Sequence, residues 1–246
     1  NGLRALFSDF SKAVHNIGQY MNTIRSSLAS RDSRCNNYIV RGQMLDCADR
    51  YCRTVSALLD GLSKRTFCSD GLRGFAEYLL AYCASEGYTG LRGHVARLRD
   101  ELSTVEYCML IKNGTIRVRK YEGQADHSKQ ILASFEKFRQ GDVKDYRHKL
   151  PEEPYAAHVE AAVLDMVAEL YGDIFADLNR FCSDYFHFDN ETILRFSREI
   201  QFYLSWLDFV APLRQTGLPF CYPMLRDTAE HLYDFDGFDL ALARIE

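Results

Sequence analysis

Apolar residues recur at alternating steps of four and three along the first sixty residues of this chain. In the first segment they stand at Leu3, Phe7, Phe10, Val14, Ile17, Met21, Ile24 and Leu28. This spacing predicts an amphipathic helix with a heptad seam. The polar stretch 30–33 interrupts it, and helical spacing continues through Tyr38, Leu45, Ala48, Cys52, Val55, Leu59 and Leu62. We therefore expect two long antiparallel helices joined by a short turn.

A heptad seam of this kind can serve either of two purposes. It can pack against other helices of the same chain, or it can bind a helix of a partner. We favour packing within the chain. Dimerisation or docking of a partner helix through the seam, without direct DNA contact, is kept as the alternative.

Helical spacing also dominates the rest of the chain outside one short region. Two stripes follow the long pair, separated by an expected turn at 86–90: Leu72, Phe75, Leu79, Leu80 and Cys83, then Leu91, Val95, Leu98 and Leu102. After residue 150 come Val159, Val163, Met166, Val167 and Leu170, and later Phe196, Ile200, Tyr203, Leu204, Leu207, Val210 and Ala211. Pro212 and Gly217 are expected to end the last helix.

The exception to the helical pattern is the segment from Val105 to Tyr121. Two β-rich runs flank Asn113-Gly114, a dipeptide typical of the type I′ turn of a β-hairpin. Side chains of a strand alternate between its two faces, so Ile116, Val118 and Lys120 share one face of the second strand. The other face presents arginines at 117 and 119.

The predicted fold class is mainly α, with a small β-hairpin inserted between two helical parts. The parts are residues 1–104, the hairpin with a basic helix and loop at 105–150, and residues 151–246. With 246 residues, 47% of them apolar, the chain is large enough to bury a sizeable core. No apolar run approaches the ~18 residues of a membrane span, so we expect no membrane partner.

Charge is distributed unevenly along the chain. The net charge is −4, but residues 112–149 contain ten Lys or Arg and five Asp or Glu, a net charge of +5. Clustered cations of this kind are what binding to phosphates requires. The DNA-contact candidates are Lys112, Arg117, Arg119, Lys120, Lys129, Lys137, Arg139, Lys144, Arg147 and Lys149. The alternative is a solvated hairpin whose arginines pair with the acidic C-terminal helices.

Residue patterns that support catalysis are missing from the sequence. There is no G-x-x-x-x-G-K-[ST] phosphate loop and no G-x-S-x-G elbow. His158-Val-Glu160 has the first half of the zinc-deaminase pattern, but no P-C-x-x-C accompanies it. The eight cysteines form no C-x-x-C pair, and we interpret them as reduced thiols of a cytoplasmic protein. We therefore expect no catalytic residue, no metal and no cofactor in this 246-residue chain.

One resemblance adds to this interpretation. The segment REIQFYLSWLDFVAPLRQTGLPFCYP resembles the end of the core and lever region of MutS-family mismatch repair proteins, and is closest to their divergent bacterial branch. The segments IRVRKYEGQADHSKQILASFEKFRQGDVKDYR, HVEAAVLDMVAELY and FDLALA agree with it in the same order. The resemblance is specific from about Val105 onward and looser over residues 1–104.

The resemblance implies a fold, a function and partners. It implies a core and lever of long helices, with 105–150 as a reduced clamp-like element that contacts double-stranded DNA without sequence specificity. A following P-loop domain would bind ATP and Mg²⁺, and the full-length protein would act as a dimer in DNA mismatch repair. The chain opens on NGLRALF and closes on DLALARIE within a helical pattern, so we expect a piece of a longer protein.

Overall fold

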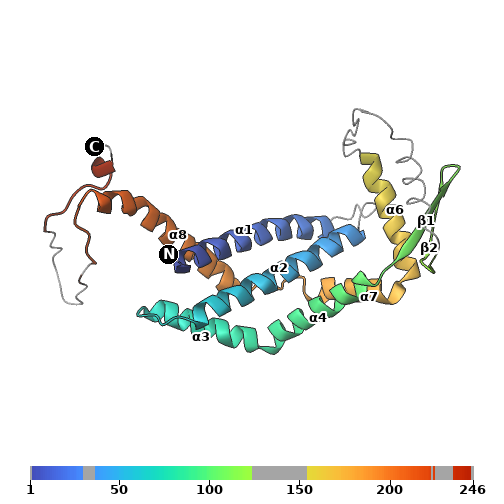
Figure 1. The fold of residues 1–246 in the computed structure, drawn as a ribbon, viewed down its shortest axis with the longest axis horizontal. Coiled ribbons are helices and arrows are strands. Elements are labelled where there is room, and N and C mark those ends of the chain that lie inside the picture. The colour runs from blue at the N-terminus through green and yellow to red at the C-terminus, as the bar shows by residue number, and fades with distance from the viewer. Residues whose placement is uncertain (1, 30–36, 124–153, 223, 225–234, 245–246) are drawn as a thin grey trace, which may run out of the picture. The chain divides into compact units, whose positions relative to one another are not determined.

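The computed structural model describes residues 2–29, 37–123, 154–222, 224 and 235–244. The chain divides into two compact units, one made of residues 1–15 with 189–246 and the other of residues 16–188. As predicted, the described residues are mainly helical and contain one small antiparallel sheet (Figure 1).

The order of elements is helices, one hairpin, and helices again. The elements are α1 (Gly2–Ala29), α2 (Asn37–Ser63), α3 (Asp70–Ala84), α4 (Glu86–Ser103), β1 (Tyr107–Lys112), β2 (Thr115–Lys120), α6 (Pro154–Leu170), α7 (Gly172–Asp184), α8 (Glu191–Gln215) and the 3₁₀ turn η1 (Leu242–Arg244). The two long helices expected at the start are therefore present as α1 and α2. None of the described helices is both long enough and apolar enough to cross a membrane.

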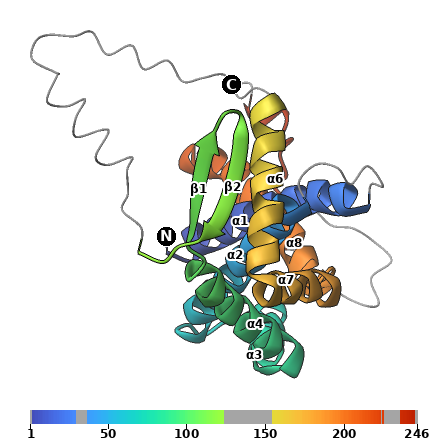
Figure 2. The same ribbon diagram turned by 90° about the vertical axis from the view of Figure 1, so that its right-hand side faces the viewer.

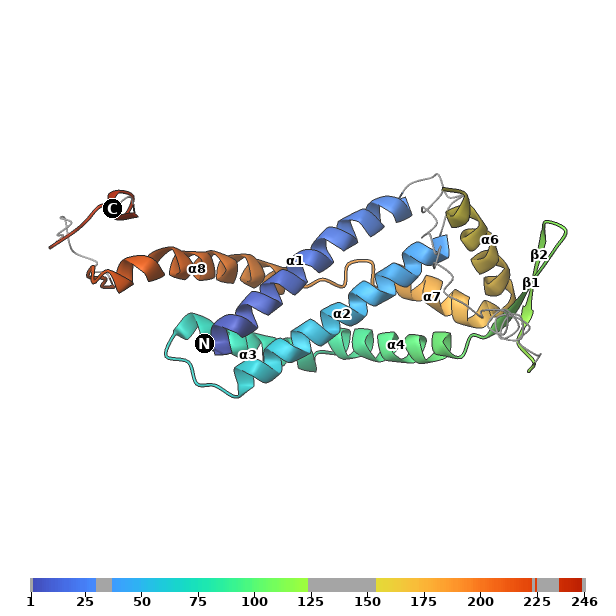
Figure 3. The same cartoon turned by 45° about the horizontal axis from the view of Figure 1, so that its top comes forward.

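In the larger unit, α2 is the element around which the others pack. It contacts α3, α4, α6 and α7, and Figure 3 shows α2 inclined to α4. Its apolar stripe is buried, as expected, although Leu58 rather than Leu59 is the fully buried leucine. The fully buried side chains of this unit include Met21, Met44, Tyr51, Val55, Leu58, Leu62, Leu79, Tyr88, Leu98, Leu178 and Phe181. Burial of such side chains is the main stabilising contribution to a core.

The start of α4 differs from the sequence expectation. Residues 86–90 do not form a turn between helices, because they are the first residues of α4. The side chain of Ser85 caps this helix by accepting a hydrogen bond from the amide of Tyr88 at 3.3 Å. The Tyr88 hydroxyl then donates to the carbonyl of Cys52 at 2.8 Å, which ties the first turn of α4 to α2. Gly87 and Gly90 are tolerated within α4 because the Ser85 cap and the Tyr88 hydrogen bond hold the first turn of the helix in place.

The hairpin has the predicted turn. Asn113 and Gly114 have φ values of 50° and 71°, and two positive values in a two-residue loop are typical of a type I′ turn. The register pairs Lys112 with Thr115 beside the turn and Tyr107 with Lys120 at the open end. β2 packs against α6, and Figure 2 shows β2 between β1 and α6.

The smaller unit is built on α8 and the first half of α1. Phe7 and Phe10 pack on the ring of Phe196, with centroid distances of 5.6 and 6.0 Å. The buried hydroxyl of Ser11 donates to the carbonyl of Ser197 at 3.1 Å, and Arg4 forms an ion pair with Asp208. The side chains of Phe10, Val14, Ile17, Met21 and Ile24 along the α1 seam are buried within the chain, which is the packing that we favoured.

Several residues of the predicted stripes are exposed, which corrects the sequence interpretation. On α8, Ile200, Leu204 and Val210 are buried, but Tyr203 is 59% exposed and Leu207 is 44% exposed. Leu80 and Val159 also lie on the surface. Helical spacing shows which residues share a face, but packing against other elements decides which of them are covered.

Candidate nucleic-acid interface

The hairpin has two chemically different faces. Residues directly opposite each other in an antiparallel pair share a face, and faces alternate along each strand. We define the cationic face by Cys108, Leu110, Lys112, Thr115, Arg117 and Arg119. The apolar face consists of Tyr107, Met109, Ile111, Ile116, Val118 and Lys120. The sequence predicted that apolar and cationic side chains of β2 point to opposite faces, and the pairing shows that β1 follows the same division.

Three of the ten predicted DNA-contact residues are brought together on the cationic face. Lys112, Arg117 and Arg119 are all exposed, and among the described residues none of them forms an ion pair. Arginines elsewhere in the same unit behave differently. Arg99, for example, lies 2.6 Å from a carboxylate oxygen of Asp46. No carboxylate of the described residues therefore neutralises these three hairpin cations.

Lys120 lies apart from these three, on the apolar face. Its ammonium is 4.9 Å from the centre of the Tyr171 ring, a cation–π contact that links the open end of β2 to the residue between α6 and α7. The remaining candidates lie outside the described residues: Lys129, Lys137, Arg139, Lys144, Arg147 and Lys149. The predicted basic helix and loop that carry them lie outside as well.

The open end of the hairpin is held by two hydrogen bonds to one backbone carbonyl, one from a side chain and one from the backbone. The carbonyl of Glu106 accepts from the hydroxyl of Tyr171 at 2.5 Å and from the amide of Tyr121 at 3.2 Å. At the end of α4, the Thr104 hydroxyl donates to the carbonyl of Glu101 at 2.7 Å. Thr104 therefore caps the end of α4, and the residue just before β1, Glu106, is bound by Tyr171.

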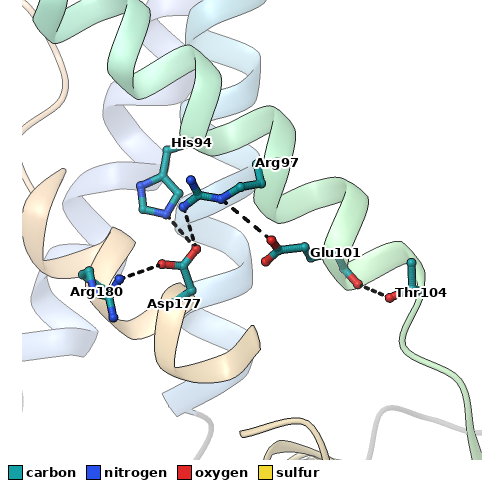
Figure 4. Close-up of polar contacts among 6 residues, drawn as sticks. All are labelled: His94, Arg97, Glu101, Thr104, Asp177 and Arg180. Atoms are coloured by element: carbon teal, nitrogen blue, oxygen red, sulfur yellow. Dashed lines mark hydrogen bonds and ion pairs between the residues drawn. The ribbon is translucent and has the colours of Figure 1, made fainter. Parts of the chain in front are cut away.

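A cluster centred on Asp177 joins α4 to α7 (Figure 4). One oxygen of Asp177 lies 3.0 Å from Nε2 of His94 and 2.9 Å from a guanidinium nitrogen of Arg97. Its second oxygen lies 3.4 Å from Arg180 on the same helix. The imidazole of His94 also packs edge-on against the ring of Phe181, at 5.2 Å. Both partners of the His94–Asp177 pair are largely buried.

The charge state of Asp177 follows from these contacts. Burial by itself pushes the pKa of this carboxyl upward, but the hydrogen bonds from Arg97 and His94 outweigh it and hold the pKa below its ordinary value. Sequence reasoning did not identify this cluster. Its members are isolated residues on two helices about 80 positions apart, so no spacing rule connects them.

The described residues offer little for metal or thiol chemistry. They contain no group of three or more His, Cys, Asp or Glu side chains that could hold a metal ion. None of the seven described cysteines is in a disulfide, and burial raises the pKa of Cys52 and of Cys182 to about 11. A thiol with so high a pKa is a poor nucleophile at neutral pH.

The interface can therefore attract a polyanion through charge, on a ribbon whose base is fixed by hydrogen bonds and packing. In comparisons with known proteins, no family model, no curated protein and no solved structure matches this chain.

Proposed function

We propose that this chain is the core and lever part of a MutS-like DNA repair ATPase, whose hairpin contacts the DNA backbone. The observation that carries the proposal is the cationic face, where Lys112, Arg117 and Arg119 are exposed and without an ion pair among the described residues. The resemblance of the sequence to the MutS core and lever region supports it. ATP and Mg²⁺ would be bound by a separate P-loop domain of the parent protein.

The spacing of these cations suits a phosphate backbone. Arg117 and Arg119 are two residues apart on one strand, which separates them by about 7 Å. Successive nucleotides of one DNA strand rise about 3.4 Å along the axis, so the two side chains span about two steps. Contacts of this kind carry no sequence information, and the proposed binding is therefore nonspecific.

The helices provide a route from the rest of the chain to the hairpin. α4 runs directly into β1, and α6 packs on β2. α4 and α7 are joined by the Asp177 cluster, and α7 follows α6 after a single residue. We propose that a displacement of these helices, driven by ATP in the parent protein, is transmitted to the hairpin through this packing.

Binding to DNA can be tested with a double variant of the hairpin. We expect Arg117→Ala with Arg119→Ala to weaken binding to a fluorescent 30-base-pair duplex and to reduce the slope of log K against log salt by about 2, because each phosphate contact contributes about 0.9. Fluorescence anisotropy over a salt series measures both quantities. The matched control is Arg195→Ala with Arg198→Ala, two exposed arginines on α8, which should bind like wild type.

Two outcomes would contradict the proposal. Wild-type protein that shows no salt-dependent binding would rule out a backbone contact. A hairpin variant with the affinity and salt slope of wild type would place the contact elsewhere.

A further inference from the structure

The first strand of the hairpin has an unusual outer edge. Among its six residues, Tyr107, Met109, Leu110 and Ile111 are exposed, the last to 67%, and Lys112 is the only charged residue. Because β2 lies between β1 and α6, the other edge of β1 faces away from that helix (Figure 2). Exposed apolar edge strands are templates for pairing with another chain, and proteins usually protect them with several charges or a proline.

The backbone pattern shows which residues are available at this edge. Pairs in an antiparallel ladder alternate between hydrogen-bonded and non-hydrogen-bonded. The amide of Tyr121 donates to the carbonyl of Glu106, so Cys108, Leu110 and Lys112 are also in hydrogen-bonded pairs with β2. Tyr107, Met109 and Ile111 therefore direct their N–H and C=O groups outward. No other described strand pairs with β1.

We propose that β1 pairs with β1 of a second copy of this chain in antiparallel orientation, which joins two hairpins into a four-stranded sheet. The outward-directed groups determine the register, because odd-numbered residues must stand opposite odd-numbered residues. A two-fold axis through Met109 pairs all the outward N–H and C=O groups of Tyr107, Met109 and Ile111. It places Met109 opposite Met109 of the second copy, and Tyr107 opposite Ile111, with two hydrogen bonds exchanged in each pair.

This register also matches the two faces of the ribbon. Residues directly opposite each other share a face, so the apolar faces of the two hairpins become continuous. Tyr107, Met109 and Ile111 of both copies then lie on the same side as Ile116 and Val118. The cationic faces become continuous on the opposite side. Any register that opposed an odd with an even residue would place apolar against cationic positions and leave the outward groups unpaired.

Charge complementarity at the ends of β1 identifies a second copy as the partner. In the proposed register Glu106, just before the strand, stands opposite Lys112 of the second copy, and the symmetry forms this pair twice. Both residues are exposed. Opposite charges directly across a ladder are favourable, and like charges are unfavourable. A nucleic acid offers no strand edge for the outward N–H and C=O groups. The inference holds whether or not the hairpin contacts DNA.

The first test deletes one outward donor without altering the hairpin itself. Met109→Pro removes an N–H that β2 does not use, and proline is tolerated where the N–H of an edge strand faces outward. In sedimentation velocity of the 246-residue chain, we expect wild type to form a dimer and Met109→Pro to raise the dimer dissociation constant at least about tenfold. Met109→Ala keeps the N–H and is the matched control. A fully monomeric wild type would overturn the proposal.

The second test is a charge exchange that is specific to this register. Glu106→Lys alone and Lys112→Glu alone should each weaken the dimer, by roughly three- to tenfold, because each places like charges opposite each other twice. The double variant restores opposite charges and should regain most of the wild-type affinity. Weakening that is additive in the double variant would rule out this register.

A cross-link keeps the proposal testable if a charge variant folds poorly. In a Cys108→Ser background, Met109→Cys places two thiols across the two-fold axis, where a Cα separation near 5.5 Å permits a disulfide. Mild oxidation should yield a covalent dimer, whereas Arg117→Cys on β2 in the same background should remain monomeric on a denaturing gel. Equal cross-linking of both variants, or of neither, would contradict the proposed interface.

Discussion

Asp177 is the residue on which the connection between α4 and α7 depends. It accepts hydrogen bonds from two residues of α4, His94 and Arg97, and from Arg180 of its own helix. A buried carboxylate is stable only if such donors compensate for its lost hydration. Removing the carboxylate would leave His94 and Arg97 without this acceptor between α4 and α7.

We predict that Asp177→Asn destabilises the larger unit by about 1–2 kcal/mol at pH 7, because its hydrogen bonds to charged partners are weakened. The pKa of Asp177 is lowered in the folded state, so the carboxylate stabilises the fold above its unfolded pKa of about 3.9. That stabilisation is lost as the pH falls through the lower folded-state pKa. Urea unfolding from pH 7 to pH 3 should therefore show a smaller loss of stability in the variant than in wild type.

The control for this prediction is Asp70→Asn. Asp70 is almost fully exposed and, among the described residues, pairs with Arg73 of its own helix, so its replacement should change stability by a few tenths of a kcal/mol. If Asp177→Asn behaves like Asp70→Asn at every pH, the cluster does not join the two helices energetically.

At the scale of elements, α8 contains both buried and exposed apolar residues at helical spacing. Leu204 is buried in the smaller unit, and Leu207, three residues later, is exposed. Phe202 and Trp206 are exposed as well, on other sides of the helix. Spacing alone does not distinguish Leu204 from Leu207, because both fall on the predicted apolar stripe of helical period.

We predict that Leu204→Ala costs about 2–4 kcal/mol of unfolding free energy, because it leaves a cavity beneath α8. Leu207→Ala makes the same chemical change at an exposed position and should cost less than about 1 kcal/mol. Thermal and urea unfolding of the two variants compares them directly. Equal losses would mean that Leu207 is buried in the protein in solution.

At the scale of the whole molecule, the two proposals make a joint prediction. A dimer paired through β1 would present two cationic faces on the same side of one sheet, and thus twice the number of phosphate contacts from Lys112, Arg117 and Arg119. We expect Met109→Pro, which leaves all three cations in place, to reduce the salt slope of DNA binding by about 2–3. Met109→Ala should keep the wild-type slope. If both variants bind DNA with the wild-type slope, the hairpin acts as a single ribbon.

The hairpin and the long helices could be predicted from local sequence. Asn113-Gly114 between alternating β-rich runs identifies the turn, because positive φ values are costly for most other residues. The alternation of β2 likewise places Arg117 and Arg119 on one face. The seam of α1 predicts a buried stripe because helical period and burial are directly coupled.

Only the tertiary structure decided how these elements are combined. It extended the cationic face across both strands, and it placed Lys120 on the opposite side against Tyr171. It brought Asp177 to His94 from a distant part of the chain, and it left Tyr203 and Leu207 exposed. The physical reason is that local sequence determines which face of an element is apolar, whereas contacts between elements determine which apolar and charged positions are covered.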